Sequence, residues 1–257
     1  MDASRFPVIL TYHSIAGGNS PLKTSPSLFT QQMEWLRANV RVALLGEVVA
    51  ALVRRSPLPE RTVVLTFDDG FGDFYSAAAP VLRRLKLPAT IFLATGYCGK
   101  TNYWPGQAGW VGEQPLLDWP QVTELAQQGF EFAAHSMTHP VLTDLSVQEA
   151  DHEIEGCKSE LEHRTGSQVQ FFAYPYGIWS PPIRALVQRH YHGACSTGAG
   201  AVEPNADPFA LPRVDAAYLR RPMLFRTLFT APFHTYVATR RFIRRVRRQP
   251  EGLYSRV

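Results

Sequence analysis

Two pairs of side chains in this sequence have the types and the spacing that metal-assisted hydrolysis requires. Asp68 and Asp69 stand side by side after the apolar run Val63–Phe67, and His135 and His139 are four residues apart. That spacing is one helical turn, so both imidazoles can face one ion at about 2.0–2.1 Å. One carboxylate would complete a site for a divalent metal with open positions, and the other would accept a proton from water. Zinc is the expected ion, with cobalt, nickel and iron as alternatives.

Each pair also has a simpler explanation. An Asp-Gly sequence such as Asp69-Gly70 is common in solvated turns, and histidines at this spacing often cap helices or hydrogen-bond within a core. A turn does not explain why the other carboxylate, Asp68, directly follows a strand that should be buried. Because residues after the carboxyl ends of parallel strands gather at one face, we expect the acidic pair and the histidine pair to meet there.

Short apolar runs alternate with helical patterns along most of the chain. The predicted strands are Val8–Tyr12, Val63–Phe67, Thr90–Leu93, Phe130–Ala134, Phe171–Tyr174, Tyr191–Ser196 and Leu211–Val214. The predicted helices are Ser27–Asn39, Asp73–Leu85, Pro120–Gln128, Leu145–Arg164 and Pro181–Arg189. Several strands are apolar on successive residues, as expected when both faces of a sheet are covered. This alternation predicts an α/β fold with a parallel sheet or an incomplete barrel.

Three motifs together resemble those of the polysaccharide deacetylases, the NodB-homology enzymes of carbohydrate esterase family four. They are T-F-D-D-G at 66–70, H-S-M-T-H at 135–139 and Y-P-Y-G at 174–177. The resemblance covers most of residues 7–215 and implies a distorted (β/α)7 barrel of mostly parallel strands. It also implies removal of N-acetyl or O-acetyl groups from amino sugars and polysaccharides with the help of a divalent metal.

The resemblance carries roles over to individual residues. It implies that Asp68 is the catalytic base and that Asp69, His135 and His139 are the metal ligands. The backbone around Tyr176 would then help to form an oxyanion hole.

The sequence departs from the family pattern in two ways. Ala173 stands where the family usually has an arginine that pairs with the catalytic aspartate, and Arg213 and Asp215 could orient the base or a substrate hydroxyl instead, or form a surface ion pair. The late motif that supplies the acid histidine is not evident. The opening P-V-I-L-T-Y-H-S-I, residues 7–15, is similar to the branch that deacetylates poly-β-1,6-N-acetylglucosamine, in which the motif order is permuted. That branch implies His13 as general acid, against the alternatives of a hydrogen-bonding residue at a strand end or a third ligand.

Other substrate contacts are expected around the same motifs. Tyr174 and Pro175 belong to the Y-P-Y-G segment, and Trp104 lies in the long loop Gly96–Leu117. An aromatic residue on a loop of this length either stacks on a ligand or packs against the loop itself. We predict substrate contact for all three residues.

Charge is distributed unevenly along the chain. Residues 1–215 carry 16 Lys and Arg against 21 Asp and Glu, a net charge of −5. Residues 216–257 carry ten Arg against one Glu, a net charge of +9. We therefore divide the chain into a catalytic domain, 1–215, and a basic amphipathic helical extension, 216–257. Within the extension, residues 220–248 interleave nine Arg with apolar residues at near-helical spacing, which is typical of a helix on an anionic membrane or near a lipid-linked substrate.

The basic stretch has two other interpretations. It could pack its apolar face on the body and leave the arginines in solvent, or it could bind nucleic acid. The regular apolar spacing and the acidic remainder of the chain argue against nucleic acid. We see no signal peptide and no run of about 18 apolar residues, so we expect a cytoplasmic protein that is peripheral at the inner membrane surface.

The leading hypothesis is a metal-dependent hydrolase that removes an N-acetyl group from an amino sugar in a polysaccharide or a lipid-linked glycan. A deformylase, or another amide or ester hydrolase acting on a lipid-linked sugar, would use the same residues. A catalytically inactive carbohydrate-binding homologue and a membrane-attached scaffold are further alternatives, against which the intact motifs argue. The sequence has no G-x-S-x-G segment, which removes the support for a serine hydrolase.

Overall fold

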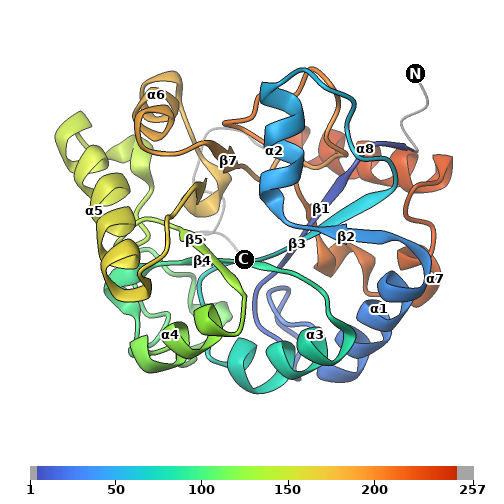
Figure 1. The fold of residues 1–257 in the computed structure, drawn as a ribbon, viewed down its shortest axis with the longest axis horizontal. Coiled ribbons are helices and arrows are strands. Elements are labelled where there is room, and N and C mark those ends of the chain that lie inside the picture. The colour runs from blue at the N-terminus through green and yellow to red at the C-terminus, as the bar shows by residue number, and fades with distance from the viewer. Residues whose placement is uncertain (1–4, 248–257) are drawn as a thin grey trace.

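The computed structural model describes residues 5–247 and contains a curled sheet of parallel strands surrounded by helices (Figure 1). The strands are β1 (Val8–Tyr12), β2 (Arg41–Ala43), β3 (Thr62–Phe67), β4 (Thr90–Leu93), β5 (Glu131–Ala134), β6 (Phe171–Ala173), β7 (Gly193–Cys195) and β8 (Val214–Asp215). They follow one another in the order β7-β6-β5-β4-β3-β1-β8, with β2 paired to β3 outside this order. These pairings are parallel, as the alternation of strands and helices predicts.

Strand β3 organises the sheet. β1 runs along one edge of it in register, from Val8 opposite Val63 to Tyr12 opposite Phe67. The other edge is divided, because β2 pairs with the first half of β3 and β4 pairs with its last two residues, Thr66 and Phe67. The acidic pair that follows Phe67 therefore emerges between β1 and β4.

The two ends of the sheet are linked through the segment before β8. Leu211 forms an isolated parallel bridge with Cys195 of β7, and Val214 pairs with Leu10 of β1. This arrangement, together with the likeness to a solved structure given below, confirms the predicted distorted (β/α)7 barrel.

The helices surround the sheet (Figure 1). The α-helices are α1 (Pro26–Asn39), α2 (Leu45–Val53), α3 (Ala79–Leu85), α4 (Trp119–Gln127), α5 (Val147–Thr165), α6 (Pro181–His190), α7 (Pro222–Phe225) and α8 (Ala231–Arg247). Ser146 caps α5 and forms a capping box with Glu149. Every residue of β1 and β3 is buried, which explains why these strands are apolar on successive residues.

Several local predictions differ from the structure. The strand predicted at Leu211–Val214 is shorter and later, as β8, Val214–Asp215, and Leu211 forms only an isolated bridge. The pattern over Asp73–Leu85 predicts one helix, whereas the structure has a π-helical turn, Phe74–Ala78, followed by α3. Pro80 is the second residue of α3 and has no backbone N–H to donate, so the hydrogen-bonding pattern changes there. The sequence patterns do not predict β2 or α2, because β2 has only three residues and the first of them, Arg41, is exposed.

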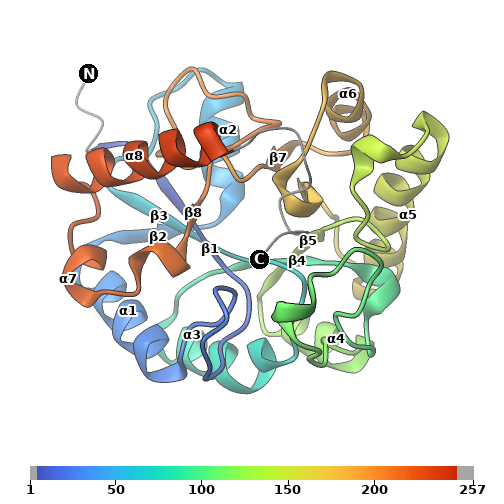
Figure 2. The same ribbon diagram turned by 180° about the vertical axis from the view of Figure 1, so that it is seen from behind.

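The C-terminal segment packs against the body of the protein, and α8 lies across the face seen in Figure 2. Phe225 of α7 and both Phe233 and Val237 of α8 are buried in the same apolar core as β1 and β3. Further along α8, Phe242 and Ile243 are 68% and 40% exposed. The first turns of α8 thus belong to the core, and later turns carry apolar side chains in solvent.

The division of the chain between residues 215 and 216 stays a prediction, and residues 1–4 and 248–257 of the two predicted domains lie outside the described part. Within residues 5–247, no helix has the length and apolar character needed to cross a membrane.

Candidate active site

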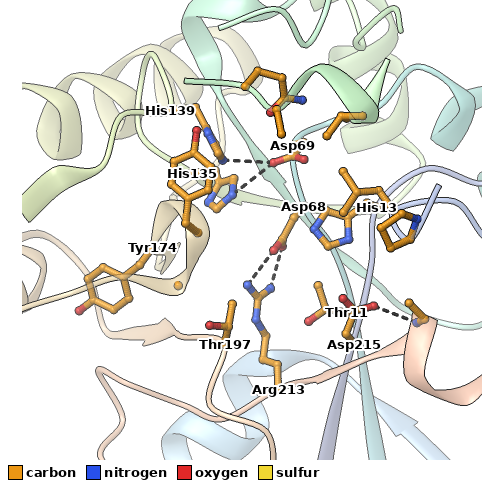
Figure 3. A pocket seen from close by; sticks show the side chains of 18 of the residues that line it. Thr11, His13, Asp68, Asp69, His135, His139, Tyr174, Thr197, Arg213 and Asp215 are labelled. Carbon is orange, nitrogen blue, oxygen red and sulfur yellow. Dashed lines mark hydrogen bonds and ion pairs between the residues drawn. The ribbon is translucent and has the colours of Figure 1, made fainter. Parts of the chain in front are cut away.

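A cavity of about 630 Å³ opens where the strands end. Side chains from several strand ends line it, namely His13, Asp68, Asp69, His135 and Asp215. Figure 3 shows the acidic pair between the histidine pair on one side and His13 on the other. The structure therefore brings the acidic pair and the histidine pair together at the carboxyl ends of the strands.

Asp69, His135 and His139 form a compact group. The Nε2 atoms of His135 and His139 each lie 3.4 Å from Oδ1 of Asp69. One ligand atom from each of the three residues lies within 4.8 Å of the others, and all three residues are buried. These are the three residues that the family resemblance implies as metal ligands.

The two histidines lie on a loop, which corrects the expectation of a helical turn drawn from their spacing. Residues 135–139 have no helical structure, and both Ser136 and His139 have positive φ, 65° and 60°. The Ser136 hydroxyl accepts a hydrogen bond from the backbone N–H of His139 at 3.0 Å. Left-handed backbone, which non-glycine residues adopt only at a cost, therefore turns His139 back toward His135.

A second left-handed turn separates the partners of the two adjacent carboxylates. Asp69 has a φ of 71° and Gly70 a φ of 75°. A Cβ atom on Gly70 would lie 2.3 Å from Cδ2 of Leu93, so the turn requires glycine at this position. Asp69 points to the histidines and Asp68 points to Arg213, as Figure 3 shows.

Arg213 forms a bidentate ion pair with Asp68. Its Nη1 and Nη2 donate to Oδ1 and Oδ2 of Asp68, both at 2.7 Å, and its Nε donates to the Ser196 carbonyl oxygen at 3.1 Å. Arg213 is buried, which argues against the surface ion pair considered for it. Ala173, at the end of β6, has no guanidinium to offer. Arg213, from the segment before β8, pairs with Asp68 instead.

The surroundings keep both carboxylates ionised at neutral pH. Burial raises the pKa of Asp68, but the charges of Arg213 and His135 outweigh it, and the pKa lies below its ordinary value. Burial also raises the pKa of Asp69, yet its contacts with His135 and His139 bring that pKa well below the ordinary value. Burial lowers the pKa of both histidines. For His135 the contact with Asp69 outweighs burial, so its pKa is raised. For His139 burial prevails, so its pKa is lowered.

His13 lies beside the Asp68 carboxylate (Figure 3), close enough for its charge to act on that group. The chain after His13 is anchored by Asp73, whose Oδ2 accepts from the Ser14 hydroxyl at 2.5 Å and whose Oδ1 accepts from the Ile15 N–H at 2.8 Å. The sequence pattern places Asp73 only at the start of the predicted helix Asp73–Leu85, and this anchoring role was missed. The available signal was the place of Asp73 in the same D-D-G-F-G-D stretch as the acidic pair.

The Y-P-Y-G residues differ in how they meet the cavity. Tyr176 has a φ of 58°, and its ring centroid lies 4.7 Å from that of His139. Tyr174 lines the cavity, but its ring points away from the histidines in Figure 3 and its hydroxyl donates to the Phe209 carbonyl oxygen at 2.9 Å. Pro175 is buried and is not among the residues that line the cavity.

Trp104 and Asp215 also line the cavity. The Trp104 ring lies 4.3 Å from that of His139, and its buried Nε1 has no hydrogen-bond partner among the residues that the structure describes. Oδ1 of Asp215 accepts a hydrogen bond from the Ala217 N–H at 2.8 Å.

The donor set of the buried group fits a divalent cation. Two imidazole nitrogens and one carboxylate oxygen form a three-residue face of the kind that leaves positions open at a catalytic metal. The second ring nitrogen of His135, Nδ1, lies 2.7 Å from the Ala173 carbonyl oxygen. This contact fixes the ring with Nε2 toward Asp69, as partners of metal-binding histidines do.

Comparisons with known proteins agree with this geometry. The family model for polysaccharide deacetylase matches residues 55–193. The chain is 30% identical over 208 residues to YxkH of Bacillus subtilis, a protein assigned to the polysaccharide deacetylases, and the match covers 80% of this chain and 70% of the relative. It is 26% identical over 216 residues to a poly-β-1,6-N-acetyl-D-glucosamine N-deacetylase of Staphylococcus epidermidis, with 78% and 71% covered.

Solved structures share the fold. IcaB from Ammonifex degensii matches with a TM-score of 0.74 and 25% identity, over 88% of this chain and 96% of that one. The Streptococcus pyogenes deacetylase PplD, solved in complex with acetate, matches with a TM-score of 0.71 and 26% identity, over 82% and 92%. By its family match, its relatives and its fold, the chain belongs to the polysaccharide deacetylases, metal-dependent hydrolases that act on acetylated polysaccharides.

Proposed function

We propose that this chain is an N-deacetylase of an amino-sugar glycan and that its metal is zinc. One observation carries the proposal. A single cavity holds a buried Asp-His-His group that suits a divalent ion, next to a carboxylate, Asp68, that Arg213 keeps ionised and oriented.

Asp69, His135 and His139 would hold the ion. When bound, a divalent cation acts as a Lewis acid that polarises a carbonyl oxygen and makes water more acidic. Asp68 accepts the proton of the water that attacks the acetamide carbonyl, because its own pKa lies low enough for it to be ionised at neutral pH.

Two further residues act on the charges that develop during this attack. The backbone N–H of Tyr176 donates a hydrogen bond to the carbonyl oxygen as it gains negative charge. His13 donates a proton to the nitrogen of the leaving amine, which would otherwise depart as an unstable anion. The opposed positions of the Asp-His-His group and of His13 around Asp68 support this division of roles.

The glycan that we propose is a β-1,6-linked N-acetylglucosamine chain. The match to the Staphylococcus epidermidis enzyme, whose name gives that substrate, supports this choice. Trp104, which lines the cavity beside His139, and Asp215 would contact the sugar. Tyr174 and Pro175 would act less directly, by shaping the turn that presents the Tyr176 backbone.

The experiment that tests the function compares N-acetylated and N-formylated oligomers of β-1,6-linked glucosamine. The full-length chain, loaded with zinc, should release acetate from the acetylated oligomer, and removal of the metal with a chelator should abolish the release. Faster release of formate than of acetate would favour the deformylase alternative. No release of either acid from zinc-loaded protein would favour the inactive carbohydrate-binding homologue, against which the intact site now argues.

The basic stretch at 220–248 supports a second, separate proposal. We infer that this stretch makes peripheral contact with an anionic membrane or a lipid-linked substrate at the cytoplasmic face of the inner membrane. The exposed apolar residues Phe242 and Ile243, which lie among the arginines, support this inference. Sedimentation with vesicles of anionic and of neutral phospholipid tests it. Equal binding to both vesicles, or binding to neither, would contradict it.

A further inference from the structure

Helix α8 supplies part of the wall of the catalytic cavity. Arg240 and Ile243 of α8 line the cavity, together with Tyr218 from the short helical segment Ala216–Leu219 that precedes α7. Figure 2 shows how α8 extends across the molecule after the chain has left β8. These residues lie beyond 55–193, the range that the family model matches.

The helical repeat explains how Arg240 reaches the cavity. Phe233 and Val237 are buried in the core. Tyr236, Arg240 and Ile243 follow them at spacings of three and four residues, on the same side of the helix. Packing of the first turns therefore fixes the direction of α8, and the next turns carry this side of the helix over the cavity.

Two tyrosines hold the Arg240 side chain. Its Nε donates to the Tyr236 hydroxyl at 3.1 Å, and its guanidinium carbon lies 5.0 Å from the ring centroid of Tyr218 and 5.5 Å from that of Tyr236. The Tyr236 hydroxyl in turn donates to the Tyr218 carbonyl oxygen at 3.0 Å. Aromatic faces orient a guanidinium without neutralising its charge.

The charge of Arg240 has no carboxylate partner within ion-pair distance among residues 5–247. The other arginine that lines the cavity, Arg213, is neutralised by Asp68. Trp104 and Gln107, from the loop after β4, also line the cavity. Each has a buried side-chain N–H group without an acceptor in the described part of the chain. Beyond the catalytic group, the cavity thus holds one carboxylate, Asp215, and one guanidinium without a carboxylate partner, Arg240. A guanidinium of this kind suits an anionic ligand.

We propose that Arg240 is a specificity residue that binds an anionic group of the glycan, a phosphodiester or a carboxylate, close to the acetylated sugar. This inference rests on the proposed deacetylase activity of the same cavity, and it replaces the neutral N-acetylglucosamine chain proposed above with a glycan that also carries an anionic group. The planar guanidinium presents paired N–H donors that match two oxygens of either group. A phosphodiester would come from a sugar linked to a lipid through phosphate, and a carboxylate from a uronic acid in an acidic polysaccharide.

Calorimetric binding to the full-length, zinc-loaded chain tests this proposal without requiring turnover. The probes are three N-acetylglucosamine derivatives: the neutral octyl glycoside, the octyl phosphodiester and a disaccharide with glucuronic acid. The variants are Arg240→Gln, Arg240→Lys and, as a matched control, Arg241→Gln, which removes a neighbouring exposed arginine that does not line the cavity. Comparing variants on the same metal separates the contribution of Arg240 from any attraction of the anion to the ion.

We expect the wild type to bind one of the two anionic probes about tenfold more tightly than the neutral one. Arg240→Gln should remove this preference, Arg240→Lys should retain part of it, and Arg241→Gln should keep it. The anionic probe that is preferred identifies the source of the charge. Equal binding of charged and neutral probes by the wild type, or equal effects of the substitutions at 240 and 241, would overturn the proposal.

Acetate release from the neutral oligomer separates failure of this inference from failure of the proposed function. Release by the wild type without any preference for an anion would leave the function standing and contradict the role of Arg240. A charge preference that depends on Arg240, in a protein that releases no acetate from any probe, would support the role of Arg240 and contradict the deacetylase function.

Discussion

Arg213 and Asp68 form a buried pair in which two parallel hydrogen bonds, each 2.7 Å long, join the guanidinium to the carboxylate. The carboxylate comes from the end of β3 and the guanidinium from the segment before β8. Because a bidentate pair fixes the plane of the carboxylate as well as its charge, Asp68 is held in one orientation beside the Asp-His-His group. The arginine absent at Ala173 is thereby replaced in space from another part of the chain.

The first prediction concerns this pair. Arg213→Lys keeps the charge but loses the planar fork, and a misplacement of about 1 Å in a catalytic group can cost about a hundredfold in rate. We expect kcat for acetate release to fall by about that factor, with little change in KM. Arg184→Lys is the matched control, since Arg184 forms a similar pair with Asp207 at 2.5 and 2.7 Å but does not line the cavity. Equal losses in both variants would argue that the effect is on stability and not on the base.

The second prediction concerns Asp68 itself. Asp68→Asn keeps the size of the side chain and removes its ability to take a proton, so we expect kcat to fall by about two to four orders of magnitude. The metal content should stay at the wild-type level, because Asp68 points to Arg213 and Asp69 to the histidines. Initial rates and mass-spectrometric metal content of the same preparation measure both. Full activity in Asp68→Asn would remove the base from the mechanism.

The third prediction concerns Asp73 as a positioning residue for His13. Asp73→Ala removes both acceptors that anchor Ser14 and Ile15, so the loop that carries His13 should loosen and kcat should fall about tenfold or more. Asp73→Asn keeps one acceptor for the Ile15 N–H and should restore most of the rate. The second readout is the comparison of kcat with Tm, because a misplaced His13 lowers kcat at a temperature where the variant is still folded. A loss of kcat in Asp73→Ala that disappears at temperatures far below its Tm would mean that Asp73 supports the fold alone.

Much of this fold can be predicted from the sequence, for a physical reason. β1 and β3 are buried on both faces, so their residues are apolar in succession and stand out from the helical patterns. β2 gives no such signal, because it is short and begins with the exposed Arg41. The break between Phe74–Ala78 and α3 follows from a single proline, Pro80, which interrupts an otherwise helical pattern.

The site residues could be named from their motifs, but their geometry could not. The spacing of His135 and His139 suggests a helix, whereas a left-handed backbone at Ser136 and His139 brings the rings together, and sequence patterns do not reveal positive φ at a non-glycine residue. The contacts of Asp68 with Arg213 and of Asp73 with the loop after His13 join segments far apart in the chain. Such contacts depend on the closed sheet and leave no local pattern.

The fourth prediction concerns the pH dependence of stability at Glu131, away from the cavity. Burial raises the pKa of Glu131, although a hydrogen bond from Thr90 acts in the opposite direction. The folded state therefore binds this proton more tightly than the unfolded state, so the free energy of unfolding falls as pH rises from the unfolded pKa, about 4.5, through the raised folded pKa. Above that window the wild type carries a constant penalty that Glu131→Gln lacks.

Thermal unfolding at two pH values measures this effect. At pH 7 we expect Glu131→Gln to have a higher Tm than the wild type, and near pH 4 the difference should shrink toward zero. Glu203→Gln, at an exposed position, is the control and should show no such dependence. A lower Tm for Glu131→Gln at pH 7 would show that the ionised carboxylate is stabilising instead.

The central claim is that Asp69, His135 and His139 hold one catalytic metal ion. Its most direct test is the metal content, by mass spectrometry, of protein purified without a metal-affinity tag, for the wild type, His135→Ala and the exposed control His152→Ala. We predict about one divalent ion per chain in the wild type and the control, and loss of the ion in His135→Ala. A wild type that binds no metal after reconstitution, or a His135→Ala variant that keeps it, would contradict the claim.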